Sequence, residues 1–226
     1  MKYSASKENY LKAIFHLQQE QGLVTTNALA AALSTRPASV TDMLKKLKEQ
    51  KLLIYERYKG FKLNNEGRKA AVQVIRKHRL WEYFLVKKLQ FGWEEVHEIA
   101  EELEHISSRA LIDRLDAFLG HPATDPHGDP IPDSQGRLLV RRQVALADWP
   151  VNKVVQVSGI ASQTTEMLEV LQHNHIRLGT RLEIRKKFPF DDSLEVKVRN
   201  HPPVTISARV AKNVWVTDDE PPAERR

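Results

Sequence analysis

Imidazole and carboxylate side chains recur at helical spacing between Lys77 and His105. Residues three and four positions apart lie on the same side of a helix, and two segments of this stretch, separated near Gly92, have that spacing. The donors are His78 and Glu82 in the first segment, and His97, Glu101, Glu104 and His105 in the second. If the two helix faces meet, the sequence predicts a metal site made by six oxygen- and nitrogen-donor side chains.

The alternative is that these residues are structural. Glutamate-rich helices usually present a solvated face, and a single histidine at such a spacing is more often structural than a ligand. Here, however, the apolar residues of the second segment form a separate stripe, and Glu98 and Glu102 lie on the far flank, so the donors are gathered on one face. Clustered carboxylates raise each other's pKa, and a divalent ion would neutralise them.

The composition narrows the possible classes of protein. The chain has 226 residues, of which 41% are hydrophobic and 28% charged, an ordinary globular balance. Thiolate catalysis, thiolate metal sites and disulfides are excluded because there are no cysteines, which fits a cytoplasmic location. We expect no membrane span and no secretory signal, because no apolar run approaches the length of a span and the N-terminus lacks an apolar segment.

Positive charge is concentrated in the first third of the chain. Residues 1–69 contain 13 Lys and Arg against 6 Asp and Glu, whereas the whole chain has a net charge of +6, so the remainder sums to −1. Such an asymmetry predicts a polyanionic partner for the first third.

The same third has the pattern of a winged helix-turn-helix. We expect helices over 6–19, 28–33 and 37–50, with Thr25 capping the second and Pro37 in the first turn of the third. Residues 52–63 alternate between apolar and polar around Tyr58-Lys59-Gly60, as in a β-hairpin. The third helix would then lie in the major groove of double-stranded DNA. A helix-turn-helix used only for packing would not explain the basic excess.

The predicted DNA contacts lie at the start of the third helix and in the hairpin. Polar and small residues would face base edges, and lysines and arginines would bind phosphates. The predicted set is Arg36, Pro37, Ala38, Ser39, Thr41, Asp42, Lys45, Lys46, Arg57 and Lys59.

The rest of the chain divides into a helical part and a strand-rich part. Long helices are expected over 68–89 and 106–119, with more apolar surface than one chain needs, which predicts a homodimer. An ordered loop over 120–135 leads to a linker at 136–147. The loop residues His121, Asp125, His127 and Asp129 are interpreted as turn residues, not as a second metal site. Beyond it we expect a small β-barrel with strands over 153–160, 181–186, 194–198, 204–208 and 214–216, one helix over 164–173, and a disordered tail at 218–226.

The chain resembles the diphtheria-toxin-repressor and manganese-transport-regulator family of metal-dependent transcriptional repressors over nearly its whole length. The motifs that carry the resemblance are RPASVTDMLKKL, RKHRLWE, VHEIAEELEH, PHGDPIP, IRLGTRLEI and KFPFDDSL. The resemblance implies an α+β protein with three domains. They are a winged helix-turn-helix DNA-binding domain at 1–69, a helical dimerisation and metal-binding domain at 70–135, and an SH3-like (FeoA-like) domain at 148–217.

The resemblance also implies two metal sites in each subunit. The primary site would use Glu101, Glu104, His105 and a position of the first helix that is Asn9 here, with adjacent Glu8 as a further candidate. The second site would use His78, Glu82 and His97. Iron-sensing members have cysteine at the position of Glu101, whereas manganese-sensing members have glutamate. This favours Mn²⁺ over Fe²⁺. Gln163 and Glu166 of the SH3-like domain are further candidate ligands.

Together these observations predict a homodimeric repressor that Mn²⁺ or Fe²⁺ activates to bind operator DNA of metal-uptake genes, and not an enzyme. Two other classes remain open at this point. Glu94-x-x-His97 and Glu102-x-x-His105 match the Glu-x-x-His unit of helical dinuclear metalloenzymes, although such sites draw these units from two helices. A winged-helix repressor that senses an organic ligand in its apolar middle is the third possibility.

Overall fold

The computed structural model describes residues 3–56, 59–138 and 142–218 and contains two compact units. The first unit comprises Met1–His78, Glu101–Asp113 and Pro132–Arg137. The second comprises Arg79–Ala100, Arg114–Ile131 and Leu138–Arg226. Each is described by itself. Arg57, the loop residue Tyr58 and the tail beyond Asp218 lie outside the described residues, so their predicted roles stay predictions.

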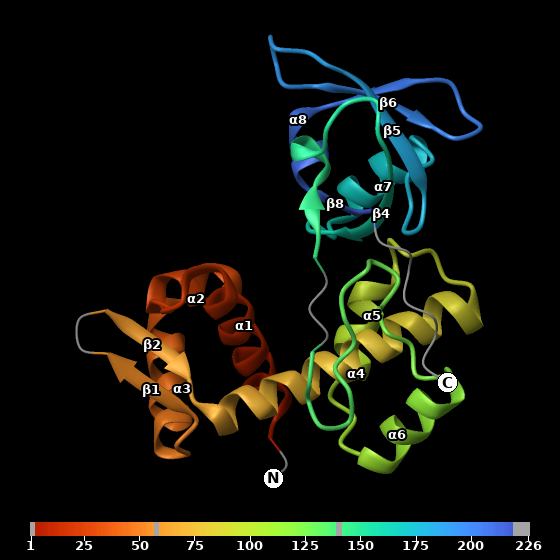
Figure 1. Cartoon of the computed structure of the whole chain (residues 1–226). Coiled ribbons are helices and arrows are strands. Elements are labelled where there is room, and N and C mark those ends of the chain that lie inside the picture. Colours follow the sequence, from red (N-terminus) through yellow and green to blue (C-terminus); the bar gives the residue numbers. More distant parts are fainter. Residues whose placement is uncertain (1–2, 57–58, 139–141, 219–226) are drawn as a thin grey trace. The chain divides into compact units, whose positions relative to one another are not determined.

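The first unit begins with the three helices and the hairpin that the sequence predicts (Figure 1). Its elements are α1 (Ala5–Gln21), α2 (Thr26–Ala32), α3 (Pro37–Glu49), β1 (Leu53–Glu56), β2 (Gly60–Leu63) and the start of α4 (Asn65–Leu89). Helix α1 ends at Gly22, whose φ of 77° is a left-handed conformation that glycine adopts without strain. Thr25 caps α2, because its side chain accepts a hydrogen bond from the backbone N–H of Ala28.

The helical periodicity of α3 fixes its orientation in the first unit. Val40, Leu44 and Leu47 recur at intervals of four and three residues and are buried. They share the core with Leu11 and Ile14 of α1, both fully buried. The opposite face of α3, which begins just after the turn from α2, is therefore left exposed.

Two further helices follow α4, and both are shorter than predicted. Helix α5 (Val96–Leu103) ends before Glu104 and His105, which lie in the following turn and not on the helix face assigned to them from the sequence. Helix α6 (Arg109–Phe118) begins three residues later than the predicted start at Ile106. Because they lie in a turn, the positions of Glu104 and His105 are not set by the helical spacing of α5.

A six-stranded antiparallel sheet lies in the second unit (Figure 1). Its strands, in spatial order, are β3 (Val144–Ala145), β8 (Val214–Thr217), β4 (Val154–Ile160), β5 (Arg181–Lys187), β6 (Leu194–Val198) and β7 (Val204–Ile206). Within the described residues β3 and β7 are unpaired edges, so the predicted small barrel is instead an open sheet. The α+β fold class predicted from the sequence is confirmed.

Short helices accompany the sheet. The predicted helix is α7 (Thr165–His173), with Thr164 as its cap. The 3₁₀ turn η1 (Leu146–Asp148) and helix α8 (Ala208–Lys212) were not expected. Ser207 ends β7 early because its side chain accepts a hydrogen bond from Val210 N–H and so starts α8. In the parts of the chain that the structure covers, no helix has the length and apolarity to cross a membrane.

Candidate metal and DNA-binding sites

One group of polar side chains, the Glu104 cluster, lies within the first unit. Its members are Glu8, Lys12, His78, Glu101, Glu104 and His105. Glu104 is fully buried, and its Oε2 atom lies 2.6 Å from His78 Nδ1 and 2.7 Å from Lys12 Nζ. His105 Nδ1 lies 2.7 Å from Glu8 Oε2. The cluster therefore joins α1 and α4 to the turn that follows α5.

The charge state of Glu104 is set by opposing effects. Burial alone would raise its pKa, but the hydrogen bond with His78 and the charge of Lys12 hold the pKa below its usual range. Glu104 is thus a buried carboxylate that remains ionised, which is the form in which it can bind a metal ion.

The two candidate ligands on α1 differ in exposure and in contacts. Asn9 is exposed on α1. The neighbouring Glu8 accepts hydrogen bonds from His105 and from Lys77, whose Nζ lies 3.3 Å from Glu8 Oε2. Of the two candidates on α1, Glu8 is therefore the one that reaches the cluster.

The donor set of the Glu104 cluster fits a divalent ion. Carboxylate oxygens and imidazole nitrogens suit Mn²⁺ and Fe²⁺. Glu104 Oε1 is buried and has no hydrogen-bond partner among the residues that the structure describes, so one oxygen of this ionised carboxylate remains available. Glu101, Glu104 and His105 would hold such an ion, with Glu8 from α1.

A second group, the His127 cluster, lies within the second unit and consists of Glu82, Asp125 and His127. All three are almost fully buried, and one potential ligand atom of each lies within 4.8 Å of the others. Asp125 and His127 belong to a turn, as the sequence predicts, and the fold also brings both of them to Glu82. Their carboxylate partner comes from a distant helix, α4.

The Trp93 carbonyl fixes the orientation of the His127 ring within its loop. His127 Nε2 lies 2.8 Å from the backbone carbonyl of Trp93, so this nitrogen donates, and Nδ1 lies 3.8 Å from Glu82 Oε2. Asp125 Oδ1 accepts hydrogen bonds from the backbone N–H groups of His127 and Asp129, which leaves Oδ2 on the other side of the carboxylate. Gly128 has a φ of 95°, and a Cβ there would collide with the backbone oxygen of Ser158.

The pKa values of both His127 and Asp125 are raised in this cluster. Burial would lower the pKa of His127, but Glu82 and Asp125 raise it to about 9. Burial, with the charges of Asp129 and Glu82, raises the pKa of Asp125 to about 7. The carboxylates of this cluster therefore need positive charge beside them, which His127 and Arg79 supply and to which a metal ion could add.

Arg79 and Gln163 border the His127 cluster. Arg79 Nη2 lies 3.1 Å from Asp129 Oδ2, and its Nε lies 3.6 Å from Asp125 Oδ2. Gln163 Nε2 donates to Asp129 Oδ2 at 3.2 Å, whereas Glu166, the other candidate from the sheet-containing domain, is exposed on α7. Gln163 thus contacts the loop through its amide nitrogen.

Each residue predicted for the second metal site has a carboxylate or imidazole partner. His78 and Glu82 lie one turn apart on α4, as predicted. Within the first unit His78 contacts Glu104, and within the second unit His97 Nδ1 lies 3.2 Å from Glu82 Oε1. Glu82 is therefore shared between His97 and the His127 cluster.

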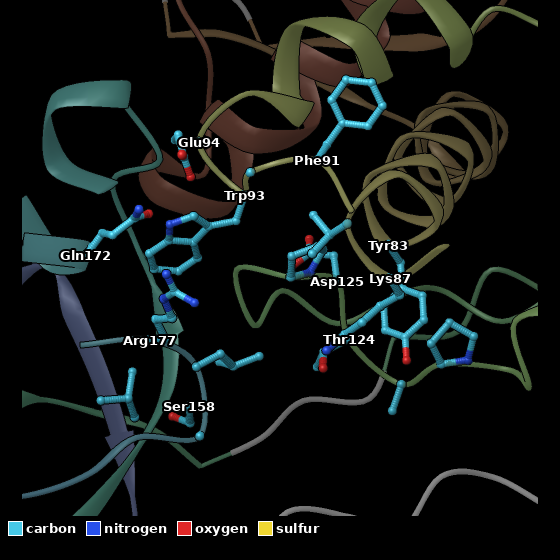
Figure 2. A pocket seen from close by; sticks show the side chains of 18 of the residues that line it. Tyr83, Lys87, Phe91, Trp93, Glu94, Thr124, Asp125, Ser158, Gln172 and Arg177 are labelled. Atoms are coloured by element: carbon cyan, nitrogen blue, oxygen red, sulfur yellow. The ribbon is translucent and has the colours of Figure 1, made fainter. Parts of the chain in front are cut away.

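A cavity of about 620 Å³ in the second unit adjoins the His127 cluster (Figure 2). Asp125 lies on its wall, together with Tyr83, Trp93 and Arg177. Asp125 therefore belongs both to the cluster and to the cavity wall.

The predicted DNA-binding residues of α3 lie on its exposed face. Exposed are Arg36, Pro37, Ala38, Ser39, Thr41, Asp42, Lys45 and Lys46, and Lys59 of the hairpin is exposed as well. Asp42 forms an ion pair of 3.4 Å with Lys45, and Thr41 Oγ1 donates to the backbone carbonyl of Pro37. Arg36 and Ser39 remain the candidates at the helix start for reading base edges.

Comparisons with known proteins identify three matched regions. Residues 2–61 match the family "Iron dependent repressor, N-terminal DNA binding domain", and residues 64–133 match "Iron dependent repressor, metal binding and dimerisation domain". Residues 144–218 match the FeoA domain. The order of the three matches is that of a three-domain metal-dependent repressor.

Individual relatives agree with this class. The regulator MntR of Geobacillus kaustophilus is 36% identical over 110 residues, which are 49% of this chain and 77% of the relative. The iron-dependent repressor IdeR of Mycobacterium leprae is 34% identical over 125 residues, 55% of this chain and 54% of the relative. A solved manganese-dependent transcriptional repressor in complex with manganese superimposes with a TM-score of 0.83 at 33% identity, covering 93% of this chain and 98% of the other.

The chain belongs to the diphtheria-toxin-repressor and manganese-transport-regulator family, in its three-domain form. This family consists of DNA-binding transcriptional repressors and not of enzymes, which decides against the metalloenzyme alternative.

Proposed function

We propose that the protein is a cytoplasmic, homodimeric repressor that a divalent metal ion activates to bind operator DNA of metal-uptake genes. The observation that carries the proposal is the Glu104 cluster, in which α1 of the DNA-binding part contacts predicted metal ligands at Glu104 and His105. An ion held there by Glu8 and by Glu101, Glu104 and His105 supplies two positive charges between helix α1 and the turn after α5. We propose the domain boundaries that the sequence predicts, with domains at 1–69, 70–135 and 148–217.

Mn²⁺ is the ion we propose, with Fe²⁺ as the second choice. The Glu104 cluster contains carboxylates and imidazoles, and the chain has no cysteine that would favour a softer ion. The solved relative named as manganese-dependent supports the same choice. Zn²⁺ and Cu²⁺ bind such ligands more tightly in solution, so selectivity in the cell would depend on which ion is available.

The proposed switch works through the spacing of two recognition helices. In a homodimer each α3 enters the major groove, and the two half-sites lie about 34 Å apart, one turn of DNA. Leu111 and Phe118, two turns apart on α6, are 41% and 64% exposed, which supports a dimer contact through this helix. The ion shifts the equilibrium only as far as it binds the DNA-competent form more tightly, and a nearly complete switch needs about 5.5 kcal/mol.

DNase footprinting with Mn²⁺ and with chelator tests the proposal. We expect protection of an operator in Mn²⁺ and its loss in chelator. Equal protection in both conditions would remove the metal switch, and calorimetry without any Mn²⁺ binding would favour a repressor that senses an organic ligand.

A further inference from the structure

A lysine ammonium lies among the predicted metal ligands of the Glu104 cluster. Lys12 Nζ is 2.7 Å from Glu104 Oε2 and 3.4 Å from Glu101 Oε1. The Lys12 side chain is 15% exposed and Glu104 is fully buried, so water screens the Glu104 contact little. A cation supplied by the chain itself therefore contacts two of the carboxylates that would bind a metal ion.

The contacts of Glu104 show what an incoming ion must displace. Its Oε2 atom has two close partners, His78 Nδ1 at 2.6 Å and Lys12 Nζ at 2.7 Å. A divalent ion bound by this carboxylate and by Glu101 would lie beside the ammonium and be repelled by it. Metal binding at this cluster is therefore in competition with Lys12, either for the same oxygen or through charge repulsion.

Lys12 differs from the other lysine nearby. Lys77 contacts Glu8 at 3.3 Å, on the α1 side of the cluster. Lys12 contacts both Glu101, in the last turn of α5, and Glu104, just after the end of α5. Since Lys12 belongs to α1, its ion pairs also connect the DNA-binding helices to the predicted ligands, as a metal ion at the same place would.

We propose that Lys12 is a built-in competitor of the divalent ion, and that it sets the metal concentration at which the Glu104 cluster fills. This inference rests on the proposed function, because it assumes that the cluster binds the activating ion. The ammonium holds the carboxylates of Glu101 and Glu104 until the ion is concentrated enough to displace it. The threshold of the switch is thus raised by one residue of α1.

The test compares Lys12 variants by calorimetric titration with Mn²⁺. In Lys12→Gln and Lys12→Met the charge is removed, and we expect Mn²⁺ to bind at least about tenfold more tightly, which corresponds to 1.4 kcal/mol. In Lys12→Arg the charge remains, and we expect less than about a threefold change. The matched control is Lys69→Gln, which removes an exposed lysine paired with Glu66 and should leave the affinity unchanged.

A second readout assigns the change to this cluster. The same titration is repeated with Glu104→Ala and His105→Ala combined, which removes the ligands of this cluster. We expect the further change Lys12→Gln to alter the remaining Mn²⁺ affinity by less than about twofold, because two changes that act on one site are not additive.

The outcomes separate this inference from the proposed function. Unchanged or weaker Mn²⁺ affinity in both Lys12→Gln and Lys12→Met, in folded protein, overturns the role of Lys12 even if Mn²⁺ still controls operator protection. Operator protection that is insensitive to chelator in the unmodified protein refutes the proposed function instead. If only the variants bind Mn²⁺ at the Glu104 cluster, the competition is supported.

Discussion

The two clusters contain the same kinds of ligand but differ in the positive charge that accompanies them. In the Glu104 cluster the charge is a lysine on a flexible side chain of α1, and Glu101 is half exposed. In the His127 cluster it is a buried histidine, fixed by the Trp93 carbonyl and by the loop around Gly128, with the guanidinium of Arg79 beside Asp125. A flexible ammonium can be displaced with little rearrangement, whereas the buried ring is part of the packing. We therefore expect the first cluster to respond more strongly to metal and the second to contribute more to the stability of the fold.

The largest expected difference between the clusters is the loss of folding stability caused by His127→Ala. This change leaves Glu82 and Asp125 buried without their imidazole, and removing one partner of a buried charge pair typically costs about 3 kcal/mol or more. Urea denaturation in chelator measures the loss. His121→Ala is the control, because His121 is half exposed and pairs with Asp116 at the surface. A loss below about 1 kcal/mol would contradict a structural role for the His127 cluster.

The next effect tests the Glu104 cluster as the switch. Replacing Glu104 and His105 together by alanine should abolish the gain in operator affinity caused by Mn²⁺, which we expect to be on the order of 100-fold from typical coupling between sites. Fluorescence anisotropy with labelled operator, in Mn²⁺ and in chelator, measures this gain. Glu102→Ala removes an exposed carboxylate of α5 and should keep it. If Mn²⁺ still raises the operator affinity of the double variant by the normal factor, the Glu104 cluster is not the switch.

A smaller effect distinguishes the two candidates on α1. Glu8→Gln should weaken Mn²⁺ binding by about tenfold, because the Glu8 carboxylate contacts His105, and groups that position or complete a metal site have effects of this size. Asn9→Ala should change the affinity by less than about twofold, since Asn9 is exposed. Calorimetry decides between them, and the reverse order of effects would restore Asn9 as the ligand.

The smallest expected effect is spectroscopic. The Trp93 ring stacks on His127 with centroids 5.8 Å apart, so an ion in the His127 cluster should change tryptophan fluorescence. All four tryptophans, Trp81, Trp93, Trp149 and Trp215, belong to the second unit. The signal should disappear in Trp93→Phe and persist in Trp215→Phe. A Mn²⁺-dependent signal that survives Trp93→Phe would show that it reports another site.

Much of the fold was predictable because it depends on local patterns. The recurrence of Val40, Leu44 and Leu47 predicts the buried face of α3, and Thr25 and Thr164 mark helix starts that the structure confirms. The failures were at boundaries. Glu104 and His105 lie beyond the end of α5, and α8 replaces the end of a predicted strand, because a turn or a capping serine outweighed weak local preferences.

The sequence by itself determined which donors are available, and it excluded thiolates, because residue type and helical spacing are local properties. Tertiary structure decided which of these donors meet. Lys12 reaches Glu104 across 92 residues of sequence, and His127 in a turn-rich loop meets Glu82 of α4. Neither contact leaves a periodic signal, because each arises only when distant segments pack and a buried carboxylate must be placed beside a positive charge.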